Sequence, residues 1–247
     1  MAEADCPADQ REDPRAPVSI TVFFPCYNEQ DNVARVAQQA VATLEALQAD
    51  YEVLIVDDGS SDATGRIADE IADDNPRIRA IHHPQNLGYG AALQSGFRAA
   101  TKELVFYTDG DGQFDIGEMP ALLPLLADYD IVSCYRMQRQ DSFMRKINGW
   151  LWTRVIRLAF SLRIRDVDCA FKLYRRALFD DIRMESTGAL IDTEILARAQ
   201  RKGYRITQRG VRHYPRTAGQ QTGANLRVIL RAFRELWQLR RRILREA

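Results

Sequence analysis

The sequence lacks the features that mark several large classes of protein. No apolar run approaches the roughly 20 residues that a membrane-spanning helix needs. Residues 1–17 are polar, acidic and proline-containing, without the apolar centre of a signal peptide, and we expect them to form a disordered lead-in. The four cysteines are scattered and form no CxxC pair, which argues against a disulfide framework or a zinc site and favours reduced thiols in a cytosolic protein.

The usual nucleotide and nucleic-acid signatures are also missing. There is no GxxxxGK[ST] segment, which excludes a P-loop, and no GxGxxG, which argues against a Rossmann dinucleotide site. The first predicted strand is not followed by the glycine-rich, arginine-containing loop that a nucleotidyltransferase would carry. Nucleic acid is not an expected partner, because the chain contains no recognition module for it.

The chain does have enough apolar content for a sizeable core, together with an uneven distribution of charge. Its 247 residues are 46% hydrophobic, which argues against global disorder. The net charge is zero, yet residues 1–130 hold 8 basic and 24 acidic residues, whereas residues 131–247 hold 26 basic and 10 acidic ones. The basic half indicates a surface that faces an anionic partner, such as a phosphate-bearing substrate or an anionic lipid.

Apolar runs and helical patterns alternate through the first half of the chain and continue into the second. The predicted strands cover residues 18–24, 51–56, 78–82, 104–108, 131–135, 171–174 and 204–208. The predicted helices cover residues 31–47, 64–73, about 90–100, 143–162, 192–202 and 224–246. This alternation predicts an α/β domain, residues 18–223, with a mostly parallel sheet covered by helices, followed by a basic amphipathic helix at 224–247.

Polar clusters follow three of the first four predicted strands. They read PCYNE, DDGSSD and DGDGQFD. Ligands of open α/β sheets bind beyond the carboxyl ends of the strands, so three such clusters predict a nucleotide crevice there.

Asp109 and Asp111 are the most informative of these polar residues. They directly follow the apolar run 104–108, and alternate residues of a strand lie on the same face. Converging carboxylates repel each other unless a cation lies between them, and Mg²⁺ and Mn²⁺ prefer oxygen ligands that they share with a substrate diphosphate. The alternative is a polar β-turn, because Asp-Gly pairs are common turn formers. Arg136 and Arg216 are candidates for further positive charge at a diphosphate.

Asp57 and Asp58 end the second predicted strand in a similar way. Their carboxylates can accept hydrogen bonds from ribose hydroxyls or from a base N–H. Helix capping by Ser60, Ser61 or Asp62 is the structural alternative, and both roles can coexist.

Six segments in order, PCYNE, VDDGSSD, NLGYGAAL, DGDGQ, YR and DVDCAFKLYRRALF, resemble family-2 glycosyltransferases of the GT-A fold. The sequence is most similar to the branch that contains dolichol-phosphate mannose synthase and the polyprenyl-phosphate glycosyltransferases. The resemblance covers about residues 18–223. It implies a GDP- or UDP-sugar donor, transfer with inversion, a Mg²⁺ or Mn²⁺ ion, and a polyprenyl phosphate acceptor.

The resemblance also implies roles for individual residues. Nucleotide contacts are implied for Pro25, Tyr27, Glu29, Val56, Asp57 and Asp58. The metal and diphosphate site would comprise Asp109, Gly110, Asp111 and Gln113, with Arg136 near the donor phosphates and Arg216 in a loop that closes over the donor. The acceptor would be met by Arg145 and by Asp166. Two departures remove phosphate contacts of the family pattern: Thr222 stands in place of a lysine, and Gly149 in place of a serine.

The acceptor decides whether a catalytic base is needed. A polyprenyl phosphate is already an anionic nucleophile, so positioning and charge stabilisation would suffice. A hydroxyl acceptor, on a sugar, a peptide or a small molecule, would need a carboxylate base. The candidates are Asp166, Asp168, Asp192 and Glu194. Among them Asp168 ranks below Asp166, and Glu194 is expected on an exposed helix face.

Two basic amphipathic segments, 143–162 and 224–246, raise the question of membrane contact. Basic helices with Trp and Phe on the apolar face suit an anionic membrane surface, and the alternative is that both apolar faces pack on the domain. We therefore expect a cytosolic protein, with or without peripheral contact to the inner face of a membrane. A non-catalytic nucleotide-sugar-binding domain on a membrane partner is a further alternative, against which the intact acidic set at residues 109–113 argues.

Overall fold

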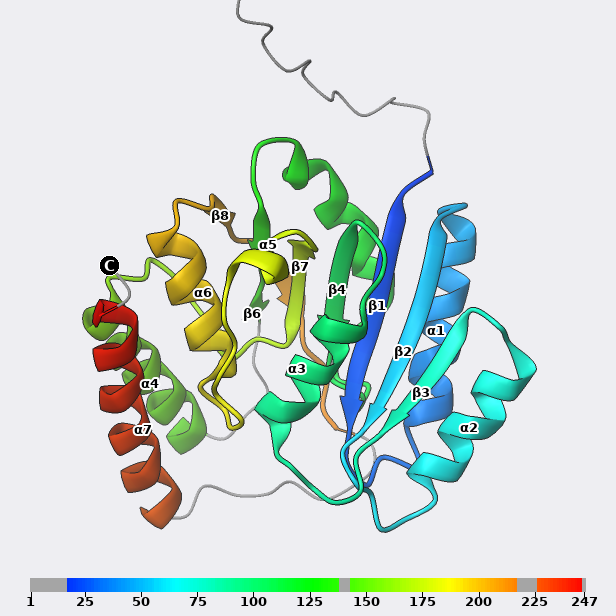
Figure 1. The fold of residues 1–247 in the computed structure, drawn as a ribbon, viewed down its shortest axis with the longest axis horizontal. Helices are drawn as coiled ribbons and strands as arrows, with labels where there is room; N and C mark the ends of the chain where they lie inside the picture. The colour runs from blue at the N-terminus through cyan, green and yellow to red at the C-terminus, as the bar shows by residue number, and fades with distance from the viewer. Residues whose placement is uncertain (1–16, 138–142, 217–225, 246–247) are drawn as a thin grey trace, which may run out of the picture.

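The computed structural model describes residues 17–137, 143–216 and 226–245, except the side chains of 143–149 and 226–233. Within these residues a seven-stranded sheet forms the centre of the fold (Figure 1). In spatial order its strands are β3 (Ile78–His82), β2 (Asp50–Asp57), β1 (Ser19–Cys26), β4 (Leu104–Thr108), β7 (Phe171–Arg175), β5 (Ile131–Ser133) and β8 (Ile206–Thr207). Strands β1 to β4 are mutually parallel, whereas β7 runs antiparallel to both of its neighbours. The expected mostly parallel α/β sheet is therefore confirmed.

The register of the sheet brings the polar clusters to one edge. Cys26 at the end of β1 pairs with Asp57 at the end of β2, and Phe23 pairs with Tyr107 of β4. Because parallel strands end on the same side of a sheet, the residues after β1, β2 and β4 meet there. The antiparallel pair Thr108 and Phe171 places the segment before β7 at the same edge.

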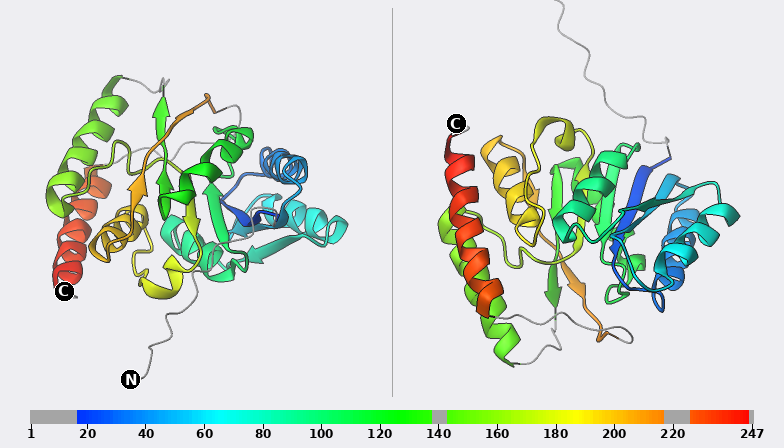
Figure 2. Two further views of the ribbon diagram at one scale, coloured as in Figure 1. Left: turned by 90° about the horizontal axis from the view of Figure 1, so that it is seen from above. Right: turned by 60° about the horizontal axis from the view of Figure 1, so that its bottom comes forward.

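Helices cover both faces of the sheet (Figures 1 and 2). Helix α1 (Val33–Ala46) contacts the 3₁₀ helix η1 (Ile116–Ala127) on one face, and α3 (Tyr89–Ala99) contacts α6 (Ile191–Arg201) on the other. Helix α2 (Thr64–Asp74) packs against the edge strand β3, and the short α5 (Leu178–Asp181) follows β7.

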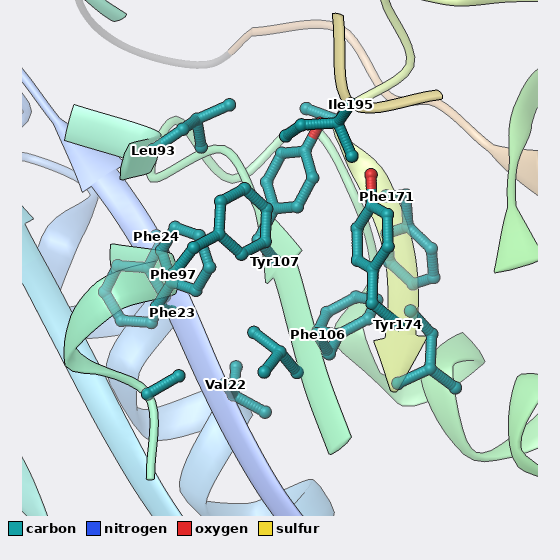
Figure 3. Packing of buried hydrophobic residues seen from close by; sticks show 14 of the residues in the cluster. Val22, Phe23, Phe24, Leu93, Phe97, Phe106, Tyr107, Phe171, Tyr174 and Ile195 are labelled. Carbon is teal, nitrogen blue, oxygen red and sulfur yellow. The ribbon is translucent and has the colours of Figure 1, made fainter. Parts of the chain in front are cut away.

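An aromatic cluster joins α3 to the sheet (Figure 3). The ring of Phe97 lies 4.9 Å from that of Phe23 and 5.6 Å from that of Tyr107, both in edge-to-face geometry. Gly96 permits this approach, because a Cβ atom there would lie 2.3 Å from the Phe23 ring. Burying one such side chain contributes about 1.5–3 kcal/mol to the free energy of unfolding, so the cluster fixes α3 firmly over β1 and β4.

The structure differs from the expected elements in the second half of the chain. The predicted strand 131–135 is divided into β5 and β6 (Tyr135–Met137), and β6 pairs with β9 (Gly210–Arg212) in a separate two-stranded sheet. Helix η1, which contains Pro120 and Pro124, was not among the predicted elements.

Two long helices, α4 (Phe143–Phe160) and α7 (Leu226–Arg245), lie side by side at the end of the domain away from β3 (Figures 1 and 2). They are joined by a hydrogen bond of 3.0 Å from Arg240 Nε to the carbonyl oxygen of Ala159. Leu236, Leu239 and Ile243 of α7 are buried in the core. No helix among the described residues combines the length and the apolar character that crossing a bilayer requires.

Candidate functional site

A pocket of about 580 Å³ opens at the edge where β1, β2 and β4 end. It is lined by Pro25, Cys26, Tyr27, Glu29, Asp58, Asn86, Tyr89, Ala92, Asp109, Gly110, Asp111 and Arg216. Most of the residues predicted to contact the donor nucleotide and its diphosphate are therefore brought together. Val56, Asp57, Gln113, Arg136 and Asp166 lie outside this lining, and the side chain of Arg145 lies outside the described part of the chain.

Asp109 and Asp111 lie directly beyond β4 in the pocket wall. Asp109 Oδ1 accepts a hydrogen bond of 3.0 Å from the Tyr89 hydroxyl. Burial raises the pKa of Asp109 to about 7, with the carboxylate of Asp111 adding to the effect. Gly110 between them is required by the close backbone, because a Cβ atom there would lie 2.5 Å from Cys26 Sγ and 3.0 Å from the Pro25 carbonyl oxygen.

The chemistry of this pair fits a divalent cation. Asp109 and Asp111 are partly buried, and the pKa of Asp109 is raised by burial and then by the charge of Asp111, so a cation that takes the place of the proton would stabilise both carboxylates. Among the described residues there is no cluster of three or more His, Cys, Asp or Glu side chains that could enclose a metal. Mg²⁺ and Mn²⁺ are often held in such a way, by one or two carboxylates and the phosphates of a substrate.

Arg216 supplies positive charge in the same pocket, close to Asp111. It forms an ion pair with Glu29, and its Nη1 lies 3.9 Å from Asp111 Oδ2. Glu29 also accepts a hydrogen bond of 2.8 Å from Asn32 Nδ2, and burial raises the pKa of its carboxyl group. The guanidinium thus lies between two carboxylates, where it can also meet the oxygens of a diphosphate.

Gln113 fixes the segment that carries Arg216. Its Nε2 donates to the Tyr214 carbonyl oxygen at 2.9 Å, and Tyr214 N donates to the Gln113 carbonyl oxygen at 2.8 Å. This contact explains how a residue after β4 holds the chain near residue 216. The role of Gln113 as a metal ligand stays a prediction. The closing-loop position Thr222 lies outside the described residues.

Asp57 brings two later segments of the chain together. Its Oδ1 accepts from Ser60 N at 3.0 Å, and its Oδ2 lies 3.0 Å from His82 Nδ1. Although burial lowers the pKa of His82, its hydrogen bonds to Asp57 and Asp69 outweigh this effect and raise it.

Asp58 has more partners than Asp57, and it also lines the pocket. Its Oδ1 lies 2.6 Å from His83 Nδ1 and accepts from Leu87 N at 2.9 Å, while its Oδ2 accepts from Gly88 N at 2.9 Å. The carboxylate therefore orders the loop before α3. A contact of Asp58 with a nucleotide remains a prediction.

Arg136 and Asp166 pair with each other, outside the lining of the pocket. Arg136 donates from Nε to Asp166 Oδ2 at 2.7 Å and from Nη2 to Asp166 Oδ1 at 2.8 Å. Although burial opposes the charge of Arg136, this two-point pairing raises its pKa. Because the pair lies outside the lining of the pocket, the predicted roles of Arg136 at the donor and of Asp166 at the acceptor are left untested.

The other candidate bases differ sharply in their surroundings. Glu194 was expected to be exposed, but it is fully buried, and its carboxylate accepts from the backbone N–H groups of Glu185 and Ser186 and from Arg198 Nε. Asp192 is buried against Lys172 Nζ at 2.8 Å and the Tyr107 hydroxyl.

Asp168 is the exception among these carboxylates. It makes no hydrogen bond within the described part of the chain, while Asp166 and Asp192 lie close by. Burial raises the pKa of Asp168 to about 6, and these neighbouring carboxylates add to the effect.

Sequence reasoning missed Tyr89, Asn86, Cys26 and Ala92 as parts of the pocket. Tyr89 and Asn86 belong to the NLGYG segment, which was noted only as part of the resemblance. A tyrosine at the start of a helix after the third strand is a usable signal, because helix starts in α/β folds meet the same ligand crevice.

Comparison with known proteins agrees with this geometry. Residues 21–183 match the family described as glycosyl transferase family 2. The chain is 34% identical over 203 residues to glycosyltransferase AglD of Haloferax volcanii. The aligned region covers 78% of this chain and 32% of that protein. The chain is also 34% identical over 163 residues to an undecaprenyl-phosphate 4-deoxy-4-formamido-L-arabinose transferase of Sodalis glossinidius. This aligned region covers 65% of this chain and 50% of that protein. The chain thus spans half or less of the length of these curated relatives.

Solved structures share the fold. Mannosyl-3-phosphoglycerate synthase from Rubrobacter xylanophilus superposes with a TM-score of 0.68 at 17% identity, covering 93% of this chain and 74% of that one. Mannosyltransferase PcManGT from Pyrobaculum calidifontis, in complex with GDP-Man and Mn²⁺, superposes with a TM-score of 0.61 at 23% identity, covering 84% of this chain and 59% of that one. The chain therefore belongs to glycosyl transferase family 2 and has the GT-A fold.

Proposed function

We propose that this chain transfers a hexose, with inversion, from a GDP- or UDP-sugar to a polyprenyl phosphate. The observation that carries the proposal is the pair Asp109 and Asp111 just after β4, with Arg216 beside Asp111 in the same pocket. Membership of glycosyl transferase family 2 supports a nucleotide-sugar donor. Relatives named for undecaprenyl phosphate support the lipid acceptor.

The residues of the pocket divide the work between binding and charge stabilisation. Asp109 and Asp111 would hold a Mg²⁺ or Mn²⁺ ion, which neutralises charge on the departing nucleoside diphosphate. Arg216 stabilises the same developing charge through its guanidinium. Pro25, Tyr27 and Asp58 line the same pocket and would bind the nucleoside. A polyprenyl phosphate needs no base, so its orientation would fall to basic residues, and the resemblance implies this role for Arg145.

A hydroxyl acceptor is a second candidate, and Asp168 is the observation that favours it. A carboxyl group without a hydrogen-bond partner among the described residues and with a pKa of about 6 is suited to take a proton near neutral pH. The ladder of β4 and β7 ends at Thr108 and Phe171, so the segments that carry Asp109 and Asp168 leave the sheet at the same edge, although Asp168 lies outside the lining of the pocket. In this case the acceptor oxygen attacks the anomeric carbon, its proton passes to Asp168, and the bond to the diphosphate breaks.

Access to a lipid acceptor requires contact with a membrane, and we place that contact on α4 and α7. Trp150 and Leu158 of α4 are 58% and 83% exposed, and Trp237 of α7 is 55% exposed. Arg154 lies over the Trp150 ring at 5.0 Å, and Arg241 over the Trp237 ring at 3.8 Å. Aromatic and basic side chains mixed in this way suit an anionic bilayer surface on the cytoplasmic side.

The test is an assay of the purified chain with GDP- and UDP-sugars, with and without Mn²⁺, and with a polyprenyl phosphate or soluble hydroxyl acceptors. We expect metal-dependent release of nucleoside diphosphate together with a lipid-linked sugar of inverted anomeric configuration, detected by mass spectrometry and NMR. Asp111→Asn should lower the rate by at least about 100-fold, whereas Asp128→Asn, an exposed aspartate beyond η1, should not.

Release of nucleoside diphosphate only with hydroxyl acceptors, abolished by Asp168→Asn, would replace the first candidate with the second. Absence of release with every donor, or full metal-dependent activity of Asp111→Asn, contradicts both candidates.

A further inference from the structure

Within the described residues, Tyr89 is the residue whose side chain donates a hydrogen bond to the carboxylate of Asp109. Tyr89 is the first residue of α3 and lines the donor pocket, and its hydroxyl donates to Asp109 Oδ1 at 3.0 Å. A hydrogen bond to one oxygen restricts the orientation of the whole carboxylate group. Neighbouring hydrogen bonds of this kind set the orientation of metal-binding carboxylates in general.

The position of Tyr89 is fixed by the segment 186–188 packed against the start of α3. Gly90 N and Ala91 N donate to the Thr187 carbonyl oxygen at 2.9 and 3.3 Å. Gln94 Nε2 donates to the Ser186 carbonyl oxygen at 2.9 Å. Three bonds thus attach the first turns of α3 to a segment that lies almost a hundred residues later in the sequence.

Two glycines of the NLGYG segment make this contact possible. A Cβ atom on Gly88 would lie 2.7 Å from the Thr187 carbonyl oxygen, and one on Gly90 would lie 2.5 Å from that of Ser186. Gly88 also has φ of +100°, which disfavours any other residue. The glycines on both sides of Tyr89 are therefore explained by the docking of segment 186–188.

Segment 186–188 is itself held by the buried Glu194 of α6. Glu194 Oε2 accepts from Glu185 N at 3.1 Å and from Ser186 N at 2.7 Å, and its Oε1 accepts from Arg198 Nε at 3.0 Å. Hydrogen bonds and the short stretches of backbone between them thus connect Glu194 of α6, through segment 186–188 and the start of α3, to Asp109. Glu194, which sequence reasoning offered as a catalytic base, has a structural place in this connection.

We propose that Tyr89 is a positioning residue for the divalent metal: it orients Asp109 for the ion and the donor diphosphate, and segment 186–188 holds it in place. This inference rests on the proposed function, since it concerns the same donor site. It assigns the NLGYG segment a purpose in the site: glycines that admit the supporting backbone, and a tyrosine hydroxyl that reaches the metal-binding carboxylate.

The test compares Tyr89→Phe with Tyr204→Phe in the full chain. Tyr204 donates to Asp181 Oδ2 at 3.1 Å, away from the pocket, so its replacement removes the same kind of bond elsewhere. Mn²⁺ affinity is measured by EPR of the free ion in the presence of UDP or GDP. We expect Tyr89→Phe to weaken Mn²⁺ binding by about tenfold or more. Binding of UDP or GDP in EDTA should change by less than about twofold, because the ring that lines the pocket is kept.

A second pair of variants tests the supporting segment. Gly90→Ala forces α3 away from Ser186, whereas a Cβ atom on Gly188 would meet only Glu235 Oε2 at 3.8 Å. Folded Gly90→Ala should lose Mn²⁺ affinity in the same direction as Tyr89→Phe, and Gly188→Ala should not.

The possible failures are distinguishable. If the wild-type chain binds no Mn²⁺ with either nucleotide, the proposed function fails. If the wild type binds Mn²⁺ and Tyr89→Phe binds it equally well, the proposed function stands and the role of Tyr89 is disproved. If Tyr89→Phe weakens Mn²⁺ binding but folded Gly90→Ala does not, the role of segment 186–188 is disproved.

Discussion

Arg216 is paired with Glu29, which lies 187 residues earlier in the sequence, and the two side chains share the lining of the pocket at the ends of β1, β2 and β4. Glu29 follows β1, whereas Arg216 follows β9 and is drawn in by the contact between Gln113 and Tyr214. The pair thus joins the first and last segments of the described pocket. A diphosphate that binds near Asp111 would accept some of the hydrogen bonds that the Arg216 guanidinium now donates to Glu29.

Replacement of this guanidinium should weaken donor binding. Hydrogen bonds to charged groups contribute about 1.5–3 kcal/mol each, so Arg216→Ala should weaken nucleoside diphosphate binding by roughly 10–100-fold. Arg216→Lys should recover only part of the loss, because one ammonium group cannot match two oxygens as a guanidinium does. Isothermal titration with UDP and GDP measures the effect.

Arg212→Ala is the matched control, because Arg212 lies in the same segment and pairs with Glu118 at 3.0 Å outside the pocket. Nucleotide binding by Arg216→Ala within threefold of that by Arg212→Ala would rule out a phosphate-binding role.

The raised pKa of Asp109 predicts a pH dependence with a definite sign. Burial and Asp111 raise this pKa to about 7, above the usual value of about 3.9 for an unfolded chain. The folded state therefore binds the proton more tightly, and in the absence of metal this group favours folding at low pH. Its contribution is lost as the pH rises from about 4 to about 7.

Metal binding should show the opposite trend, because Mn²⁺ must displace that proton. The apparent Mn²⁺ affinity should rise with pH up to about 7 and level off above it. Calorimetry below pH 7 in two buffers of different ionisation enthalpy counts the protons released on binding. Release of no proton at pH 6 would show that Asp109 is already ionised there.

The parts of the site that sequence could predict are those encoded within a short stretch. Asp109 and Asp111 are recognisable because an apolar strand ends directly in two carboxylates, and Gly110 between them is explained by local crowding. The alternation of strands and helices likewise follows from local periodicity. The pocket at the ends of β1, β2 and β4 then follows from the rules of parallel sheets.

The parts that sequence could not predict depend on partners far along the chain. Asp58 looks like a free nucleotide ligand until His83, 25 residues later, occupies one of its oxygens. Glu194 is a charged residue of a kind that usually lies on an exposed helix face, yet it is fully buried, and its carboxylate accepts hydrogen bonds from the backbone N–H groups of Glu185 and Ser186. Neither contact leaves a periodic signal, since each is made by a side chain with a loop.

The buried pair of Lys172 and Asp192 should dominate the stability of the region behind the site. Lys172 is fully buried and donates to Asp192, to the Tyr107 hydroxyl and to the Cys169 carbonyl oxygen, so all its protons are satisfied. Lys172→Met leaves Asp192 buried without its cation and should lower the free energy of unfolding by about 3–5 kcal/mol. Urea denaturation measures the change.

An exposed pair provides the comparison. Lys202 binds Asp181 at 2.7 Å, about half exposed on both sides, and Lys202→Met should cost less than about 1 kcal/mol. Equal losses from the two substitutions would mean that burial of the first pair has no energetic consequence.

The exposed aromatic residues of α4 and α7 lead us to predict that the chain binds anionic lipid. Trp150 and Trp237 project from helices whose opposite faces are anchored in the core by residues such as Ile156 and Leu239, so they are available without unfolding. We expect the chain to co-sediment with vesicles that contain anionic lipid, and less so with neutral vesicles or at high salt, because exposed charges are screened.

Replacing both tryptophans by alanine should reduce vesicle binding by at least about tenfold, since each aromatic side chain contributes about 1.5–3 kcal/mol when it leaves water. Tyr129→Ala is the control, because this exposed aromatic residue follows η1, away from both helices. Transfer to a short, water-dispersed polyprenyl phosphate should survive the double substitution, because the donor pocket is untouched. Vesicle binding that is unchanged by the double substitution, or equal on neutral lipid, would place the membrane contact elsewhere.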